Sequence, residues 1–172
     1  LFNPELMLTA LRAARAAGAL ISLDLASSTV VEESRDLLDR IVKEYVDIVV
    51  ANEDEARAFT GLTDEQQCSA VLAQKADIAV VKLGERGSAI SHQGRMMRID
   101  PLGSGRAVDT TGAGDLWASG FLYGLVNGYP LERCGRIGSA CGYEVCQVIG
   151  AAIPEEGWRR IREMIEESQN GD

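Results

Sequence analysis

Hydrophobic and polar residues alternate along the chain between a helical period and short apolar runs. Residues 4–17 carry leucine and alanine at helical spacing and are followed by Gly18, which predicts a helix that ends at a glycine. Residues 19–25 are apolar apart from Ser22 and Asp24, as is typical of a buried parallel strand. The same alternation predicts helices at residues 32–45, 53–60, 64–75, 112–127, 131–148 and 154–169, and strands at residues 46–50 and 77–82.

Turn-forming residues follow the last of these strands. A glycine-bounded turn at residues 84–87 leads into two short strands, 88–92 and 95–99, and Gln93-Gly94 predicts the hairpin turn between them. Residues 101–106 are rich in Gly, Ser and Pro, which predicts a mobile loop. Helices that alternate with strands indicate one α/β domain with a mostly parallel sheet.

Composition limits the classes of function. Of the 172 residues, 46% are hydrophobic and 25% are charged, which are ordinary values for a globular domain. The net charge of −9 argues against a surface for nucleic acid or for an anionic membrane. No apolar run approaches the ~20 residues of a membrane span. We therefore expect neither a nucleic-acid partner nor a membrane partner.

The cysteines favour a reducing compartment. They form no C-x-x-C pair and no spacing typical of a metal site, and the single histidine, His92, lies far from them in the sequence. Burial as free thiols is therefore the favoured interpretation for Cys68, Cys134, Cys141 and Cys146. Such thiols fit the cytoplasm or an organelle stroma.

The most specific chemical signal is the run Asp-Thr-Thr-Gly-Ala-Gly-Asp at residues 109–115, directly before an apolar segment of helical period. Its glycines can adopt a positive φ and bring backbone N–H groups against an anion. The helix that follows adds the positive end of its dipole. Asp115, in the first turn of that helix, places a carboxylate beside the anion. The run therefore predicts an anion site with a candidate base. Taken alone, Asp115 could equally be an acidic residue whose only role is to interact with the positive end of the helix dipole.

This run resembles the C-terminal signature of the ribokinase-like (PfkB) carbohydrate and nucleoside kinases. Two more segments resemble that family's motifs in the expected order: residues 52–55 its Asn-x-x-Glu motif, and residues 80–88 its strand–turn–strand nucleotide-binding segment. The resemblance implies a ribokinase-like, Rossmann-type α/β fold whose mostly parallel sheet is flanked by helices. It also implies transfer of a phosphoryl group from ATP to an alcohol. The sequence has no P-loop run, and residues 103–105 lack the third glycine of a dinucleotide-binding fingerprint.

The resemblance assigns a role to each part of the run. Asp115 matches the catalytic base, which accepts the proton of the attacking hydroxyl group. The backbone N–H groups of Gly112, Ala113 and Gly114 match the anion hole that stabilises the phosphoryl oxygens. Thr110, in the same motif, matches the nucleotide side of the site.

The other two segments imply the rest of the nucleotide site. Asn52 matches a residue near the phosphates, and Glu55 one that holds the water around Mg²⁺. The same residues also have a purely structural interpretation, in which Asn52 is the N-cap of a helix and the acids that follow occupy its first turn. Lys82, Gly84 and Gly87 match contacts to the phosphates and ribose of ATP, with Lys82 as a point charge. Glycines in a hairpin turn are compatible with both interpretations.

Two further features follow from the resemblance. Asp109 and Thr111 match one half of the family's monovalent-cation site, and residues 145–150 are the candidate for the other half. Potassium is therefore an option and not a prediction. Arg86 and Arg106 are basic candidates near the path of the phosphates.

Members of this family are considerably longer, and their N-terminal half carries most of the acceptor pocket and a β lid. Residues 1–172 therefore resemble the C-terminal portion of such a kinase domain, with that half and the lid absent. Residues 23–27 and 47–56 favour the adenosine-kinase-like branch. Two interpretations stay open: the ATP-binding part of a kinase that phosphorylates a hydroxymethyl group of a sugar or nucleoside, or a catalytically incomplete nucleotide-binding or assembly module. In both, we expect self-association or a partner chain over the sheet surface left open.

Overall fold

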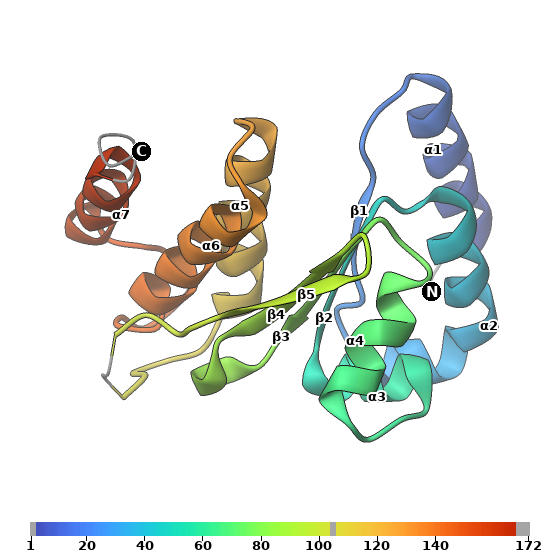
Figure 1. Ribbon diagram of the computed structural model, residues 1–172, viewed down its shortest axis with the longest axis horizontal. Helices are drawn as coiled ribbons and strands as arrows, with labels where there is room; N and C mark the ends of the chain where they lie inside the picture. Colours follow the sequence, from blue (N-terminus) through green and yellow to red (C-terminus); the bar gives the residue numbers. More distant parts are fainter. Residues whose placement is uncertain (1–2, 104–105, 168–172) are drawn as a thin grey trace. The chain divides into compact units, whose positions relative to one another are not determined.

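The structure is a computed structural model that describes residues 3–103 and 106–167 (Figure 1). Part of the predicted loop at residues 101–106, and the last two residues of the predicted helix at 154–169, lie outside this range. The helices are α1 (Pro4–Ala16), α2 (Ser28–Tyr45), α3 (Glu53–Thr60), α4 (Glu65–Ala73), α5 (Ala113–Val126), α6 (Leu131–Val145) and α7 (Glu155–Glu167). The strands are β1 (Ser22–Asp24), β2 (Ile48–Asn52), β3 (Ile78–Lys82), β4 (Ser88–His92) and β5 (Arg95–Ile99), and a 3-10 turn, η1, covers Gly84–Arg86.

The strands form one sheet in the order β1-β2-β3-β4-β5. β1, β2 and β3 run parallel, and their register places Asp24 opposite Val50 and Asn52 opposite Lys82. Between β4 and β5, Gln93 and Gly94 have φ values of 49° and 74°, as a two-residue hairpin turn requires. Both the parallel strands and the hairpin were predicted from the sequence, and both are confirmed.

The described chain divides into two compact units: the first holds residues 3–83 and 89–97, and the second holds residues 84–88, 98–103 and 106–167. In the first unit, α1 to α4 lie on one side of the strands (Figure 1). Their apolar residues form one core with the sheet, which includes Val31, Ile41, Val49, Phe59, Leu72 and Val81. β2 and β3 are buried along all but their last residue, which explains why both appear in the sequence as continuous apolar runs.

The second unit is built on a close pair of helices, α5 and α6. Glycines on both helices let the backbones approach, because a Cβ at Gly120 would lie 2.8 Å from Cys141 Sγ, and one at Gly138 would lie 2.8 Å from the carbonyl oxygen of Trp117. Trp117 stacks on Phe121 with 5.4 Å between ring centroids. This packing fixes the start of α5, where residues 109–115 lie.

Several predicted boundaries were wrong by a few residues. β1 is shorter than residues 19–25, and β2 begins at Ile48 and not at residue 46, because Asp47 is a buried linker whose carboxylate accepts the Ile21 N–H at 2.7 Å. α2 starts at Ser28, before residue 32, and bends at Ser34, which has φ −124°. A hydrogen bond such as that of Asp47, or a bend such as that at Ser34, does not change the apolar period of the sequence, so the pattern could not predict these boundaries.

Candidate functional site

The second unit contains the run 109–115, which ends in the first turn of α5. Gly112 is the N-cap with φ 76°, so the predicted positive φ is present. A Cβ at Gly112 would lie 2.7 Å from Ala151 Cβ, which adds a packing reason for glycine there. Asp115 occupies the third position of the helix and is exposed, as predicted.

The amides of this turn are only partly available. The N–H of Ala113 donates to the carbonyl oxygen of Thr110 at 3.1 Å, and that of Leu116 donates to Gly112 at 2.9 Å. The N–H groups of Gly114 and Asp115 belong to the first turn of a helix, where no intrahelical acceptor exists. Within residues 3–103 and 106–167, the carboxylate of Asp115 forms no hydrogen bond or ion pair. The turn therefore offers free donors and a solvent-exposed carboxylate at one helix end.

Asp109 joins this turn to the loop after α6. One carboxylate oxygen accepts the N–H of Thr111 at 3.0 Å and its hydroxyl at 2.8 Å, and the other accepts the N–H of Gly150 at 2.8 Å. The bond from Gly150, followed by those from Thr111, lowers the pKa of Asp109. The N–H of Val108 also donates to the carbonyl oxygen of Cys146 at 2.8 Å. The structure thus brings together the two segments that the resemblance associates with a monovalent cation.

In the first unit, Asn52 and Glu55 form a reciprocal cap at the start of α3. Asn52 Oδ1 accepts the N–H of Glu55 at 2.9 Å, while the two oxygens of Glu55 accept the N–H and the amide group of Asn52, each at 2.7 Å. Glu55 is only 4% exposed, and this burial raises its pKa. The N-terminal cap that the local sequence suggested is therefore present in the structure. Its hydrogen bonds fix the side chains of Asn52 and Glu55 at the carboxyl end of β2.

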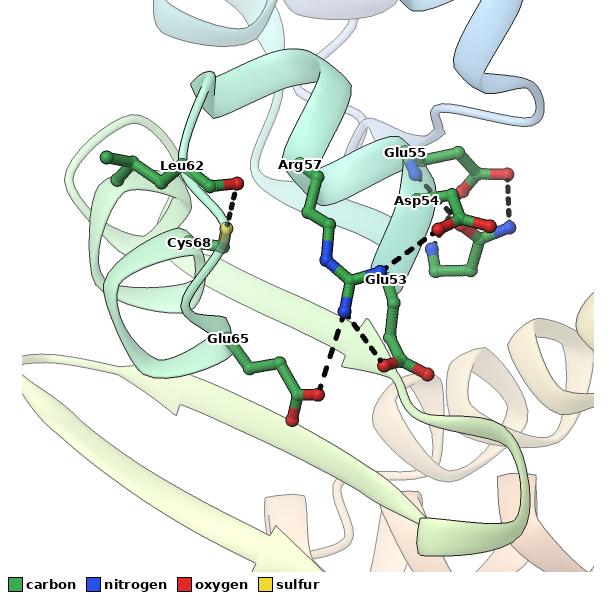
Figure 2. A network of polar contacts seen from close by, with 8 residues as sticks. Glu53, Asp54, Glu55, Arg57, Leu62, Glu65 and Cys68 are labelled. Atoms are coloured by element: carbon green, nitrogen blue, oxygen red, sulfur yellow. Dashed lines mark hydrogen bonds and ion pairs between the residues drawn. The ribbon is translucent and has the colours of Figure 1, made fainter.

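The acidic residues next to Glu55 form ion pairs with Arg57 (Figure 2). Arg57 lies 3.4 Å from Glu53 and 3.1 Å from Asp54 on its own helix, and 4.0 Å from Glu65 on α4. Near them, Cys68 Sγ donates to the carbonyl oxygen of Leu62 at 3.5 Å. The contact with Glu65 joins α3 to α4, and the bond from Cys68 joins α4 to the loop between the two helices.

Lys82, at the end of β3, forms an ion pair with Asp24, at the end of β1, with 2.7 Å between Nζ and Oδ2. Asp24 was not among the predicted site residues. The signal that could have found it is the position of polar residues at the carboxyl ends of neighbouring parallel strands, where ligands bind in open α/β sheets.

Of the remaining predicted residues, Gly84, Arg86 and Gly87 belong to the turn before β4, and Arg106 lies in the segment between β5 and α5. Gly84 and Gly87 have φ values of 56° and 84°, and a Cβ at Gly87 would lie 2.0 Å from the carbonyl oxygen of Ile99. Arg106 is exposed, and the carbonyl oxygen of Arg86 accepts a bond from Arg98 at 2.9 Å. Gly87 is thus required by the backbone itself, with or without a ligand, whereas at Gly84 the positive φ favours glycine but no neighbouring atom excludes a Cβ.

Metal-binding side chains do not gather into an obvious cluster. In the described part of the chain, no group of three among His, Cys, Asp and Glu could hold a metal ion. Glu55 belongs to the first unit, and Asp109 and Thr111 belong to the second. All four cysteines are free thiols, and Cys68, Cys134 and Cys141 are buried, as predicted. The predicted burial of Cys146 was wrong, because this residue is only half-buried just after the end of α6. Among the described residues, no helix has the length and apolar character needed to cross a bilayer.

A sheet with polar residues at its carboxyl edge and a glycine-capped helix start are typical of α/β proteins that bind phosphate-bearing ligands. The family model for the pfkB family carbohydrate kinases matches residues 2–157. The chain therefore belongs to the pfkB family of carbohydrate kinases.

Individual relatives agree with this assignment. The chain is 34% identical over 93 residues to a nucleoside kinase of Methanocaldococcus jannaschii, covering 54% of this chain and 31% of that protein. Adenosine kinase from Sinorhizobium meliloti superposes with a TM-score of 0.86 at 32% identity, covering 91% of this chain and 48% of that one. Ribokinase of Arabidopsis thaliana, solved with ribose and ATP, gives a TM-score of 0.77 at 26% identity, covering 92% and 52%. The fold is thus ribokinase-like, and the chain spans about half the length of these solved kinases.

Proposed function

We propose that this chain takes part in ATP-dependent phosphorylation of a hydroxymethyl group on a sugar or a nucleoside. The observation that carries the proposal is the start of α5, where Gly112 has φ 76° and the exposed Asp115 follows in the first turn. Family membership supports phosphoryl transfer. The relatives are named as kinases of nucleosides, of adenosine and of ribose, and the ribokinase is bound to ATP.

In this proposal Asp115 is the general base. The hydroxyl oxygen of the acceptor attacks the γ-phosphorus of ATP, its proton passes to a carboxylate oxygen of Asp115, and ADP leaves. The free N–H groups of Gly114 and Asp115, with the positive end of the helix dipole, stabilise the charge on the phosphoryl oxygens. Ala113 contributes its N–H only if the bond to Thr110 opens, whereas Gly112 provides the backbone conformation that aims the turn.

The first unit is proposed to serve the nucleotide. Lys82 places an ammonium group at the carboxyl end of β3, where it can neutralise one phosphate oxygen. Asn52 and Glu55 offer oxygen donors, the class that Mg²⁺ prefers, and each Glu55 oxygen that bonds Asn52 keeps a second lone pair for a metal-bound water. Bound Mg²⁺ would reduce the negative charge on the phosphates.

Asp109 and Thr111 place oxygen atoms, the ligands that hard cations prefer, beside the loop that contains Gly150. This arrangement supports the proposal that a monovalent cation binds there. We treat potassium as an optional activator. A higher melting temperature in KCl than in an equal concentration of choline chloride would support it, and equal values would count against it.

The test begins with isothermal titration of the chain with Mg·ATP, followed by a phosphorylation screen over nucleosides and sugars. Where turnover is found, Asp115→Asn should lower it by roughly 10²- to 10⁴-fold while leaving nucleotide affinity within a few-fold. Glu132→Gln is the matched control, because Glu132 is an exposed first-turn acid on the neighbouring helix α6. Unchanged turnover in Asp115→Asn would refute the role of this base.

A second candidate is a nucleotide-binding or assembly module without turnover. It is supported by the coverage of relatives, since the chain spans about half the length of the solved kinases that it matches. Tight binding of Mg·ATP with no product from any acceptor would favour this candidate. Failure to bind Mg·ATP would refute both.

We also propose that the β1 edge of the sheet is covered by a second copy or a partner chain. β1 is an outer strand, Ser22 is exposed, and Leu20 beside it is 67% exposed. Light scattering should show a species larger than the 18.5 kDa monomer, and a strictly monomeric particle would count against self-association. Free thiols support a cytoplasmic or stromal location, which fractionation would test.

A further inference from the structure

Asp24 is the last residue of β1, and its carboxylate makes two directed contacts. Oδ1 accepts the N–H of Ala26 at 2.9 Å, and Oδ2 accepts a bond from Lys82 Nζ at 2.7 Å. Ala26 has φ 61°, a conformation that costs energy for any residue with a Cβ. The contact with Oδ1 is part of what holds this turn, and in return the turn fixes the direction of the carboxylate. Asp24 is therefore a rigid acceptor.

Lys82 has the opposite character, since its side chain is long and has several rotatable bonds. It is nevertheless largely enclosed, with 15% of the side chain exposed against 29% for Asp24. β2 lies between β1 and β3, so the ion pair crosses the carboxyl end of β2, where Asn52 is the register partner of Lys82. An ammonium group has three donors, and Asp24 uses one of them. Within the described residues Lys82 Nζ bonds no other acceptor, so two donors remain at the sheet edge where ligands of parallel α/β proteins bind.

The carboxylate of Glu55 also lies within electrostatic reach of this lysine. Glu55 is close enough for the charge of Lys82 to lower its pKa and for that of Asp24 to raise it. Both oxygens of Glu55 are engaged by Asn52 in the cap of α3. If Lys82 turned to Glu55, the ammonium group would be lost to the ligand and the cap would be disturbed. In the structure Lys82 Nζ contacts Asp24 Oδ2, at 2.7 Å.

We propose that Asp24 is a positioning residue, which holds the ammonium group of Lys82 ready for a phosphate oxygen of a nucleoside triphosphate. The inference rests on the proposed function, because it takes ATP as the ligand. Binding leaves the Asp24–Lys82 pair in place and adds phosphate oxygens to the two unused donors. The carboxylate thus favours an anionic ligand by orienting a cation, although its own charge repels that ligand.

The test is a double-mutant cycle on nucleotide affinity, measured by isothermal titration of the chain. Asp24→Asn keeps the acceptor for Ala26 and removes the charge that orients Lys82. It should weaken Mg·ATP binding about 5- to 30-fold, within the usual range for a charge-assisted contact. Lys82→Met should weaken it at least as much, and the double variant should be no weaker than Lys82→Met alone. Lys82→Gln replaces Lys82→Met if the latter unfolds.

Two controls separate positioning from a general structural effect. Adenosine, whose binding is checked by competition with ATP, has no phosphate and should lose less than about twofold in affinity in either variant. Asp77→Asn removes an exposed carboxylate at the other end of β3 and should leave Mg·ATP affinity unchanged. Melting temperatures recorded in parallel show whether each variant is folded.

The outcomes are distinct. Tighter binding of Mg·ATP by Asp24→Asn would overturn the inference, because Asp24 would then only repel the ligand. Additive losses in the cycle, or equal losses for adenosine and ATP, would also overturn it while leaving the proposed function intact. Absence of any Mg·ATP binding by the unmodified chain would overturn the proposed function, and this inference with it.

Discussion

The carboxylate of Asp109 accepts a hydrogen bond of 2.8 Å from the N–H of Gly150, which lies 41 residues later in the chain. Together with the bond from the Val108 N–H to the Cys146 carbonyl oxygen, this contact holds the loop after α6 against the turn that leads into α5. In Asp109→Asn one oxygen can still serve Thr111, but the amide group that replaces the other cannot accept the Gly150 N–H. We expect hydrogen exchange at the Gly150 amide to accelerate by roughly tenfold or more, as for a lost charge-assisted bond.

Asp100→Asn is the control for that measurement, because Asp100 is exposed and precedes the same turn. Exchange at Gly150 should be unchanged in this variant. Slow exchange in Asp109→Asn would show that the loop is held by other contacts, such as the one between Val108 and Cys146.

Gly138 and Gly142 lie one turn apart on α6 and should respond oppositely to the same change. A Cβ at Gly138 would lie 2.8 Å from the carbonyl oxygen of Trp117 and 3.0 Å from its ring, so Gly138→Ala must push α5 and α6 apart. We expect it to lower the free energy of unfolding by about 1–3 kcal/mol. A Cβ at Gly142 would meet its nearest atom at 3.4 Å, close to ordinary contact.

Gly142→Ala should therefore be neutral or stabilising by up to about 1 kcal/mol, because alanine has the higher helix propensity. Urea denaturation of the two variants and the unmodified chain measures both effects. Equal destabilisation by the two substitutions would show that the helices are not held by close contact at Gly138 in particular.

The sequence predicted the type of every helix and strand, because each has a clear apolar period or a clear turn residue. The hairpin around Gly94 was predicted with its boundaries, since two-residue turns have few alternatives. The ion pair of Asp24 with Lys82 was not predicted, because it depends on which strands become neighbours. The same holds for the bond between Asp109 and Gly150, although the resemblance had associated their two segments. Local pattern gives the elements, whereas contacts between distant residues require the register of the sheet and the packing of helices.

Arg160 and Glu144 illustrate an asymmetric ion pair between α7 and α6. Arg160 donates to both oxygens of Glu144, at 2.7 and 2.6 Å, while the side chain of Glu144 is 7% exposed and that of Arg160 is 49% exposed. Arg160→Met leaves a buried carboxylate without its cation, whereas Glu144→Gln leaves an arginine that water can reach. We therefore expect Arg160→Met to lower the melting temperature more than Glu144→Gln, by roughly several degrees.

Thermal denaturation at pH 7 and pH 5 tests this order. The deficit of Arg160→Met should shrink at pH 5, because a buried carboxylate that has lost its cation takes up a proton more readily. A larger deficit for Glu144→Gln at pH 7 would show that the shape of the Glu144 side chain matters more than its charge balance.

Asp39 should contribute to stability only above its own pKa. Hydrogen bonds from Lys43 and then Lys75, with ion-pair distances of 2.7 and 2.5 Å, lower the pKa of Asp39 below its ordinary value. A depressed pKa in the folded state means that the stabilisation is complete above the unfolded pKa, about 3.9, and is lost as the pH falls through the folded pKa. Asp39→Asn should thus lower the free energy of unfolding by up to about 1 kcal/mol at pH 7, since the side chain is 34% exposed.

Urea denaturation between pH 7 and pH 2.5 measures this effect. The difference in unfolding free energy between Asp39→Asn and the unmodified chain should shrink below about pH 4. Asp36→Asn, which changes an exposed neighbour on α2, is the control and should show little difference at any pH. A deficit for Asp39→Asn that stayed constant to pH 2.5 would mean that the ionised form of Asp39 is not what stabilises the fold.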